Sequence, residues 1–370
     1  MAHPEAIIAG AGVAGLAAAH WLTKAGWSVK VVEKASTFRF GGHLMGLSGP
    51  GFKALEHMGI LDQLKPHARV ASENICFDRS NREILRIRHS DLIGDTPFLV
   101  IRRSDLVESL AEVLGDRAEI TFETSITSIS STDRKARVTL SDGGEIEADL
   151  LIGADGMRSQ ARQLMFPEVT APVEHLGYRF VVFEVEFDAA PTRQLWSYVA
   201  PGHMAEIFGV TEKRALILLV WNTEETGKVS SAEVPDLLRE EFDCVHPIIN
   251  DLITRAEDQN ELFVFDTLSM TVLPQWSRGR TVLLGDAAHA LSLVSGQGAG
   301  MALTGAKILA DALETVEMEE ALRAYEERMR PAISSLQNRS RKLAKWYVPQ
   351  SPWAFRRRNL MLKVIPKWLM

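Results

Sequence analysis

Three short segments, far apart in the chain, combine glycines with an acidic residue as nucleotide-binding sites do. The first reads G-A-G-V-A-G at residues 10–15, after the apolar residues 6–9, and Glu33 ends the next apolar run. In such a turn the glycines permit a tight bend, a close approach of the backbone to a pyrophosphate, and close packing of the following helix. The N–H groups at the helix start attract phosphate, and a carboxylate about 20 residues further on binds ribose hydroxyls.

The other two segments also follow apolar runs. Residues 149–152 lead into G-A-D-G at 153–156, and residues 280–284 lead into G-D-A-A-H at 285–289. Because ligands of α/β proteins bind outside the carboxyl ends of the strands, we expect the three turns to meet around one extended ligand. This favours a dinucleotide over a single nucleotide. Aspartate is also common in turns and helix caps, so a purely structural role is the alternative for Asp155 and Asp286.

A parallel sheet covered by helices must position these turns. The chain begins with a β-α-β pattern, and helical sequence covers residues 299–313 and 321–345. Residues 119–122 and 137–140, with the turn at 141–144, are typical of a β-hairpin.

A strand is expected at residues 97–101, and a helix follows it. Ser104 or Asp105 is suited to cap this helix, with Glu108 completing a capping box for Asp105.

The pattern changes between about residues 172 and 276. Apolar strands at 178–187, 205–210 and 214–221 are interrupted by helices at about 232–242 and 248–255. A chain of 370 residues suits two domains. We therefore predict an α/β (α+β) fold, with a Rossmann-like dinucleotide-binding domain, an inserted β-sheet domain and C-terminal helices. The first domain takes residues 1–70, 101–170 and 277–330, the second takes 71–100 and 171–276, and residues 331–370 form a basic helical tail.

The three motifs in this order resemble the p-hydroxybenzoate hydroxylase-like class of FAD-dependent monooxygenases, which includes polyketide hydroxylases and tetracycline-inactivating monooxygenases. The second motif continues as M-R-S at residues 157–159, and the third leads to G-Q-G at 296–298. The patch I-R-R-S-D-L at residues 101–106 also resembles the class. The resemblance spans roughly residues 5–330 and makes the first domain an FAD-binding domain and the second a substrate-binding domain.

The resemblance implies FAD as the cofactor and NAD(P)H as the co-substrate. Glu33 would hold the adenosine ribose, Arg103 would reach the ribityl and phosphate region, and Asp286 would bind near the ribityl chain. The helix that begins at Gly298 would point its N-terminus at the pyrimidine edge of the flavin ring, where its dipole stabilises negative charge. The expected cofactor-binding residues are Gly10, Gly12, Val13, Ala14, Gly15, Glu33, Lys34, Arg39, Arg103, Asp155, Gly156, Gly285, Asp286, Gly296, Gly298 and Ala299. The alternatives are a surface charge for Arg103 and a packing role for His289.

The implied activity is insertion of one oxygen atom from O2 into an organic substrate. NAD(P)H reduces FAD, a C4a-(hydro)peroxyflavin forms, and an aromatic or polyketide-like substrate is oxygenated, with hydroxylation as the default outcome. Epoxidation and Baeyer–Villiger insertion use the same flavin species. The pocket must exclude water. Its candidate lining residues are His43, Met45, Tyr178, Phe180, Phe208, Trp221 and Leu293, and His43 is also the one candidate for acid–base chemistry. Core packing is the alternative for each aromatic residue.

Three positions differ from the usual pattern of the class. Many members have proline where this chain has Leu293, glycine at Ser295 and asparagine at Gly300. These differences leave open a flavoenzyme of the same fold that does not activate oxygen, such as a double-bond reductase or a flavin-requiring cyclase. The absence of a W-x-W-x-I-P segment disfavours a flavin halogenase.

The cysteine content and the apolar runs of the chain indicate its cellular compartment. Two cysteines, Cys76 and Cys244, form no disulfide framework and disfavour a structural metal site, so we expect a reducing cytoplasm. The glycine-interrupted N-terminus lacks the basic segment of a signal peptide, and no apolar run is long enough to span a membrane.

Charge is distributed unevenly along the chain. The net charge is −7, and residues 328–370 carry 11 Lys or Arg and no Asp or Glu, which leaves −18 for the rest (−7 minus +11). We expect the basic tail to dock on this acidic body. No basic domain supports nucleic-acid binding. The tail also mixes aromatic and basic residues as interfacial segments do, so peripheral membrane contact is the alternative.

Overall fold

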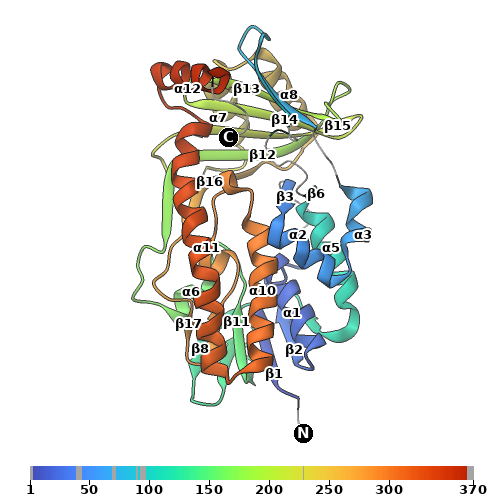
Figure 1. Cartoon of the computed structure of the whole chain (residues 1–370), viewed down its shortest axis with the longest axis vertical. Helices are drawn as coiled ribbons and strands as arrows, with labels where there is room; N and C mark the ends of the chain where they lie inside the picture. The colour runs from blue at the N-terminus through green and yellow to red at the C-terminus, as the bar shows by residue number, and fades with distance from the viewer. Residues whose placement is uncertain are drawn as a thin grey trace.

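The structure is a computed structural model that describes residues 3–38, 44–68, 72–88, 91, 97–227 and 229–364. Figure 1 shows an elongated molecule in which two sheet-containing regions lie one above the other along the long axis. The predicted site residues Arg39 and His43 lie outside the described residues.

The region that begins the chain is built on a six-stranded sheet with the strand order β17-β18-β11-β1-β2-β7. Neighbouring strands are parallel except for the pair β17–β18 at one edge. Strands β1, β11 and β18 are almost wholly buried, which explains why all three read as continuous apolar runs. The bounds are β1 Glu5–Ala9, β2 Ser28–Val32, β7 Glu119–Thr121, β11 Leu150–Gly153, β17 Ser277–Arg278 and β18 Thr281–Leu283.

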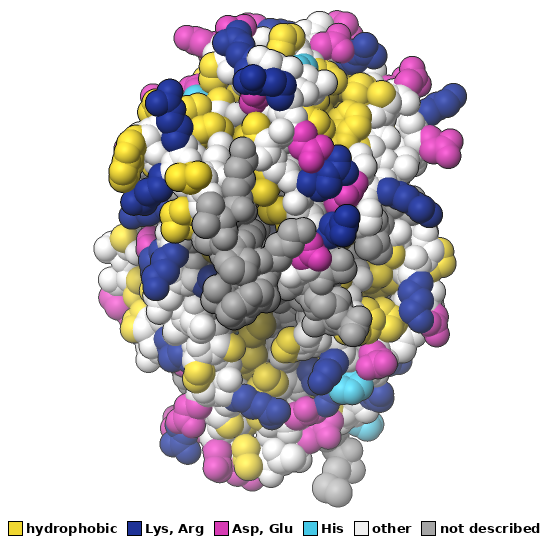
Figure 2. All heavy atoms as spheres, turned by 45° about the horizontal axis from the view of Figure 1, so that its top comes forward, with side chains coloured by type: hydrophobic (Ala, Val, Ile, Leu, Met, Phe, Trp, Pro, Cys, Tyr) yellow, Lys and Arg dark blue, Asp and Glu magenta, His cyan; other side chains and the backbone are white. Residues whose placement is uncertain are grey.

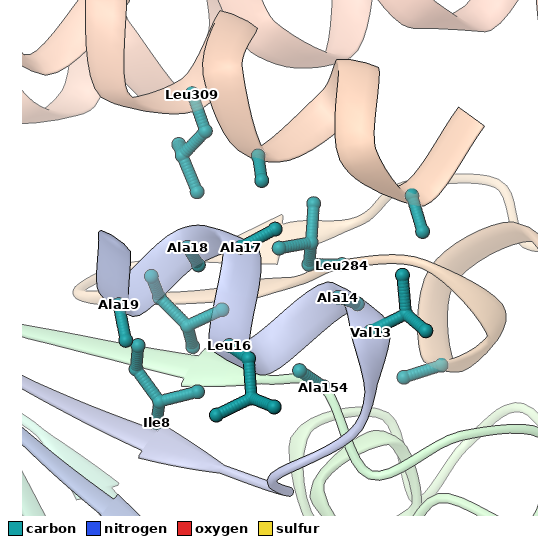
Figure 3. Close-up of a cluster of buried hydrophobic side chains, with 14 of the residues drawn as sticks. Ile8, Val13, Ala14, Leu16, Ala17, Ala18, Ala19, Ala154, Leu284 and Leu309 are labelled. Atoms are coloured by element: carbon teal, nitrogen blue, oxygen red, sulfur yellow. The ribbon is translucent and has the colours of Figure 1, made fainter. Parts of the chain in front are cut away.

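Small side chains bring the covering helices close to this sheet. Figure 3 shows the alanines of α1 (Val13–Lys24) between Ile8 of β1 and Leu309 of α10 (Gly298–Thr315). These residues belong to the main hydrophobic core of the protein. Gly26, just beyond α1, has a φ of +86°, a conformation that suits glycine and ends the helix. The other helical elements of this region are α2 Gly49–Met58, α3 Leu61–Leu64, η1 Lys65–His67, α5 Arg103–Leu114, η2 Gly115–Arg117, α6 Gln160–Met165, α9 Asp286–His289 and η3 Leu293–Ser295.

Two small sheets complete the region. Strands β8 (Ile126–Ser131), β9 (Ala136–Leu140) and β10 (Glu145–Ala148) form an antiparallel sheet, and β3 (Leu44–Ser48) pairs with β6 (Phe98–Arg102). The hairpin prediction was right for β9 and β10 but wrong for residues 119–122, because β7 pairs in parallel with β2 instead.

The predicted cap of the helix after β6 was also wrong. The chain turns from β6 directly into α5, so Arg102 is the N-cap residue, and it makes no side-chain cap bond. Ser104 and Asp105 therefore lie inside the helix.

The second region is a seven-stranded mixed sheet with the order β16-β12-β15-β14-β13-β4-β5. One of its faces packs against α7 (Val234–Phe242) and α8 (Pro247–Asp258), and the other faces the first region and the C-terminal helices. Strands from the early segment 71–100 join it, because β4 pairs in parallel with β13. The bounds are β4 Glu73–Phe77, β5 Glu83–Arg88, β12 Val173–Glu186, β13 Gln194–Ala200, β14 His203–Thr211, β15 Arg214–Asn222 and β16 Val264–Thr271.

A long helix, α11 (Met318–Tyr347), runs along the molecule from the first region to the second sheet, and α12 (Pro352–Val364) follows it (Figure 1). The predicted boundary at residue 331 falls inside α11, because its buried face continues from Tyr325 past Pro331 to Ile333 and Ala344. None of the helices in the described part of the chain has the length and apolarity needed to cross a lipid bilayer. The predicted fold class is confirmed.

Candidate active site

The ends of the three central strands lie side by side. The N–H of Ala154, after β11, donates to the carbonyl of Ala9 at 2.8 Å, and the N–H of Leu284, after β18, donates to the carbonyl of Gly153 at 2.9 Å. Parallel pairing therefore brings the three glycine-bearing turns to one edge of the sheet. The structure brings together what the chain separates by about 140 and 130 residues.

The glycines of the first turn differ in the reason that each position holds glycine. Gly10 has a φ of +107°, and a Cβ placed on it would lie 2.5 Å from the carbonyl oxygen of Ala154. A Cβ on Gly15 would lie 1.9 Å from the carbonyl oxygen of Gly10. The protein's own packing thus requires glycine at both positions.

Gly12 is a glycine of a different kind. Its φ of −84° suits any residue, and the one atom near a Cβ placed there is Nη2 of Arg103, at 3.7 Å. Nothing in the packing of the protein forbids a side chain at Gly12, so the open space above it is left for a ligand. This cradle at the start of α1, with an arginine beside it, fits a pyrophosphate.

Glu33 holds the turn in shape. Its Oε2 accepts a hydrogen bond from the N–H of Ala11, and its Oε1 accepts one from the N–H of Ala35, both at 2.9 Å. The carboxylate is therefore fixed at the end of β2, beside the cradle, where a ribose would lie. Lys34, which follows it, is exposed.

Asp155 anchors the helix that follows its turn. Its carboxylate accepts hydrogen bonds from the Ser159 hydroxyl, from the N–H of Gln160 at 2.7 Å and from the N–H of Ala161 at 3.0 Å. The structural alternative raised for Asp155 thus describes its contacts, and its predicted role in cofactor binding stays a prediction.

Arg162 is a site residue that the sequence analysis missed. It is buried in α6 and donates to the carbonyls of Met157, at 2.5 Å, and Ala287, at 3.0 Å. Burial lowers the pKa of its guanidinium, and the negative charge of Asp155 opposes this. Arg162 therefore ties the second turn to the third. Nothing in its sequence spacing marks it, because its partners are backbone carbonyls.

Asp286, in the third turn, lies near the start of α10 and near Arg103. A Cβ on Gly298, at the start of α10, would lie 4.0 Å from Oδ1 of Asp286. The side chain keeps access to solvent, yet the surrounding protein raises the pKa of its carboxyl, and the positive charge of Arg103 opposes the rise. Arg103 is thus close to both Gly12 and Asp286, so α5 and residues of the first and third motifs meet in one place.

The start of α10 faces the short sheet of β3 and β6. Nε2 of Gln297 donates to Oγ of Ser48 at 3.2 Å, and Gly296 has a φ of +61°. The first turn of α10 itself has no acidic residue, and the nearby carboxyl is that of Asp286. A Cβ on Gly51 of α2 would lie 2.4 Å from the Cα of Gly300, whereas a Cβ on Gly300 itself would lie 3.4 Å from the Cα of Gly51, so packing requires glycine at Gly51 and does not explain the departure at Gly300.

An apolar face of the second sheet covers this area. Phe180 and Leu218 pack with Leu293 and Val294 of η3, and they also belong to a cluster that includes Leu44 of β3. Two ion pairs join the two regions. Arg102, at the end of β6, pairs with Glu184 at 3.2 Å, and Arg158, which follows β11, pairs with Asp266 at 2.9 Å. The apolar side chains that this face presents here, among them Phe180 and Leu218, are partly buried.

The four aromatic candidates for the pocket lining separate in the structure. Phe180 lies on the face described above, and Phe208 shares that face because it pairs with Leu216. Tyr178 is fully buried on the same face, where its hydroxyl donates to the carbonyl of Val348 at 3.1 Å.

Trp221 packs on the opposite face, with its ring 6.0 Å from that of Phe242 in α7. Its assignment to the pocket was therefore wrong, and the core alternative holds, because neighbouring residues of a strand point to opposite faces. Of the two other candidates, Met45 is buried in β3 and Leu293 is partly buried in η3.

Two further titratable groups lie in this part of the molecule. Glu206, on β14, is buried on the face that carries Phe208; burial raises the pKa of its carboxyl, while hydrogen bonds from Tyr347 and Ser197 oppose the rise. The sequence analysis missed it, because a glutamate within an apolar strand carries no motif. His289 packs against Trp276, with ring centroids 4.7 Å apart, and burial lowers its pKa to about 4. Its packing role, raised as the alternative, agrees with these contacts.

Comparison with known proteins identifies the family. A family model described as "FAD binding domain" matches residues 4–340. The chain belongs to this FAD-binding family. The 2-heptyl-3-hydroxy-4(1H)-quinolone synthase of Pseudomonas aeruginosa is 31% identical over 373 residues, covering 97% of this chain and 94% of that protein. The 6-hydroxynicotinate 3-monooxygenase of Pseudomonas fluorescens is 29% identical over 341 residues, covering 85% and 83%.

A solved structure shares the fold of this FAD-binding chain. HpxO of Klebsiella pneumoniae, in complex with FAD and uric acid, superposes with a TM-score of 0.83 at 23% identity, covering 97% of this chain and 92% of that one. The predictions of FAD as the cofactor and of an FAD-dependent monooxygenase as the class of enzyme are confirmed, and NAD(P)H is the co-substrate typical of the family. The individual cofactor and substrate residues stay predictions.

Proposed function

We propose that this chain uses NAD(P)H and O2 to insert one oxygen atom, most simply as a hydroxyl group, into a small and mostly apolar ring compound. The observation that carries the proposal is the position of the start of α10. It lies between the strand-end turns, through Gly298 and Asp286, and the apolar face of the second sheet, through η3. Relatives named for a quinolone and a hydroxynicotinate, both flat heteroaromatic rings, support a substrate of this class.

The residues of this chain would share the work of holding FAD. Gly12 and the start of α1 would take the pyrophosphate, with Arg103 beside them, and Glu33 would meet the adenosine ribose. Asp286 and the start of α10 would lie along the ribityl chain and the ring. FAD, when bound, supplies the chemistry that no side chain here has, namely transfer of hydride from NAD(P)H and activation of O2.

The protein contributes electrostatics and exclusion of water. The N-terminus of α10, whose first turn holds no acidic residue, has a dipole equivalent to about half a unit charge and would stabilise negative charge that develops on a ring placed against it. The apolar residues around Phe180 keep water away from the reacting atoms. Phe180 and Phe208 would stack against the substrate ring, and Leu293 would lie close to the flavin edge.

The test combines a spectrum, a rate and a mass. The purified protein, loaded with FAD, is expected to show the absorption of oxidised flavin and to consume O2 and NADH or NADPH faster when a flat heteroaromatic compound is added. Product formed under 18O2 should gain one labelled atom. Bound FAD with reduced substrate but no substrate-stimulated O2 uptake would instead support the double-bond reductase alternative.

A matched pair of variants sharpens the test. Phe180→Ala changes the proposed pocket, whereas Leu262→Ala changes an exposed leucine elsewhere on the same region. The first should lower kcat/KM about tenfold or more with FAD content unchanged. The second should leave both unchanged. We further propose a cytoplasmic location, supported by the free thiols of Cys76 and Cys244.

A further inference from the structure

Large hydrophobic side chains on the surface are concentrated near the C-terminal end of the described chain. Eight such side chains stand out among the described residues, and four of them lie between positions 346 and 361. Their exposed fractions are 40% for Trp346, 68% for Trp353, 64% for Leu360 and 38% for Met361. Single exposed apolar residues are ordinary, but a group of this size within 16 positions marks an interaction surface.

The exposed residues of α12 share one side of the helix. Trp353 and Leu360 are seven positions apart, which is two helical turns, and Met361 follows Leu360. Arg356 and Arg357 are exposed beside them, and the guanidinium of Arg357 lies over the Trp353 ring at 4.8 Å from its centroid.

The other side of α12 fixes the helix to the protein. Phe355 packs into the apolar cluster that contains Val348, and Arg358 donates to the carbonyl of Tyr347 at 2.9 Å. Arg358 is largely buried, and burial lowers its pKa. The helix is therefore held by Phe355 and Arg358, which leaves the side with Trp353 and Leu360 turned outward. The prediction that the basic tail docks on the body agrees with these contacts.

Charge in this part of the chain has a single sign. Residues 328–370 hold 11 Lys or Arg and no acidic residue, against −18 for the remainder. Lys342 and Lys345 are exposed on the last turns of α11, near Trp346. Figure 2 shows basic and hydrophobic side chains, together with acidic ones, at the end of the molecule formed by the second region.

We propose that this α12 surface, made of Trp353, Arg356, Arg357, Leu360 and Met361, docks on an anionic lipid bilayer. The aromatic and aliphatic side chains would enter the headgroup region, and the arginines would pair with lipid phosphates. The proposal goes beyond the oxygenation reaction and does not depend on it. The contact is peripheral, because among the described residues no helix can span the bilayer.

Lipid suits this surface better than nucleic acid, which is the other polyanion. Arginines alone would suffice for a phosphate backbone, whereas Leu360 and Met361 would stay exposed to water in such a complex. A bilayer interface buries both kinds of side chain at once. The −18 charge of the remaining chain would repel a long polyanion that wraps the protein, but it is compatible with a flat surface that only α12 touches.

The experiment is co-sedimentation of the full-length, FAD-loaded protein with lipid vesicles. One set of vesicles is phosphatidylcholine alone, and in the other about a third of the lipid is phosphatidylglycerol, an anionic lipid. We expect binding to the anionic vesicles, at least about tenfold weaker binding to the neutral ones, and release by high salt of the electrostatic part.

Two variants and their matched controls identify the surface. Trp353→Ser with Leu360→Ser should weaken binding at low and high salt about tenfold, whereas Leu262→Ser, at a leucine that is also 68% exposed, should not. Arg356→Glu with Arg357→Glu should abolish the preference for anionic lipid. The control Arg134→Glu with Lys213→Glu changes the net charge equally at exposed positions elsewhere and should not.

Three results would overturn the proposal. They are no binding to anionic vesicles, equal loss in the control variants, and binding to an oligonucleotide that Trp353→Ser with Leu360→Ser leaves unchanged. Flavin content and O2 uptake, measured on each variant, report the state of the active site separately and show that the variants are folded.

Discussion

The two regions of this protein build their parts of the site in different ways, the first through its backbone and the second through its side chains. In the first region the backbone shapes the cofactor site. Glycines let the strand ends approach one another at Gly10 and Gly15 and leave room for a ligand at Gly12. In the second region the side chains decide, since Phe180 and Trp221 lie on neighbouring central strands of the same sheet yet serve opposite faces. A cofactor that many proteins share is recognised by a motif, and a substrate that is particular to one protein is recognised by a surface.

The comparison is tested most severely at Gly12. Gly12→Val places a side chain in the open cradle and should weaken FAD binding about 1000-fold, or ~4 kcal/mol. The stability of the FAD-free protein should hardly change, because φ at this position is −84° and the nearest atom is a movable arginine end. FAD affinity by flavin fluorescence and thermal unfolding of the FAD-free protein measure the two effects.

Gly10→Val is the matched control. At a φ of +107° and 2.5 Å from a backbone oxygen, its side chain should destabilise the fold itself. If both variants lost FAD affinity and stability alike, Gly12 would be one more packing glycine and the proposed cradle would be refuted.

The next effect separates the two faces of the second sheet. Trp221→Ala should lower the free energy of unfolding by about 3–5 kcal/mol, because it opens a cavity between the sheet and α7. The kinetic constants of the surviving folded enzyme should stay close to those of the parent chain. Phe180→Ala should do the reverse, with a small stability loss and a large loss in kcat/KM. Urea unfolding and steady-state rates on both variants decide, and an equal pattern in the two would contradict the assignment of faces.

The sequence predicted the cofactor-binding turns of the first region better than the faces of the second sheet. Gly10, Gly12, Gly15 and Glu33 indicated the cofactor through their spacing, in which Gly10 and Gly15 are required by the packing of the backbone and Gly12 and Glu33 are suited to a ligand. The faces of β15 were beyond reach, since alternation shows that Leu218 and Trp221 point opposite ways but not which side another domain covers. Arg162 was missed because its partners are backbone carbonyls, one of them Ala287, 125 residues further along the chain. The predicted helix over residues 321–345 lies within α11, but the predicted domain boundary at residue 331 falls inside that helix, which accommodates Pro331.

A smaller effect concerns pH. Burial against Trp276 lowers the pKa of His289 from 6.5 to about 4, so the folded protein binds fewer protons than the unfolded chain between these values. Stability therefore falls as the pH drops through this window, by up to ~3 kcal/mol for this one group. His289→Leu should flatten the loss of stability between pH 6.5 and 4, measured by urea unfolding. His57→Leu, at an exposed histidine of α2, should leave the curve unchanged.

The smallest expected effect sharpens the comparison at its least obvious point, the carboxyl of Glu206 on the apolar face. Its raised pKa means that the folded protein holds its proton more tightly than the unfolded chain, so stability falls as the pH rises above the ordinary range of a glutamate and through the folded pKa. Glu206→Gln keeps the shape and removes the titration. It should be more stable than the parent protein by on the order of 1 kcal/mol at neutral pH, with the difference vanishing in acid.

The variant Ser197→Ala, which removes one hydrogen-bond donor to Glu206, should deepen the loss of stability at neutral pH. Urea unfolding from pH 4 to 8 gives both results. A parent protein that gains stability over Glu206→Gln as the pH rises would show that the carboxylate is held charged. The second sheet would then hold Glu206 as a charged carboxylate next to its aromatic residues, rather than as a neutral carboxyl that a flat apolar ring can approach.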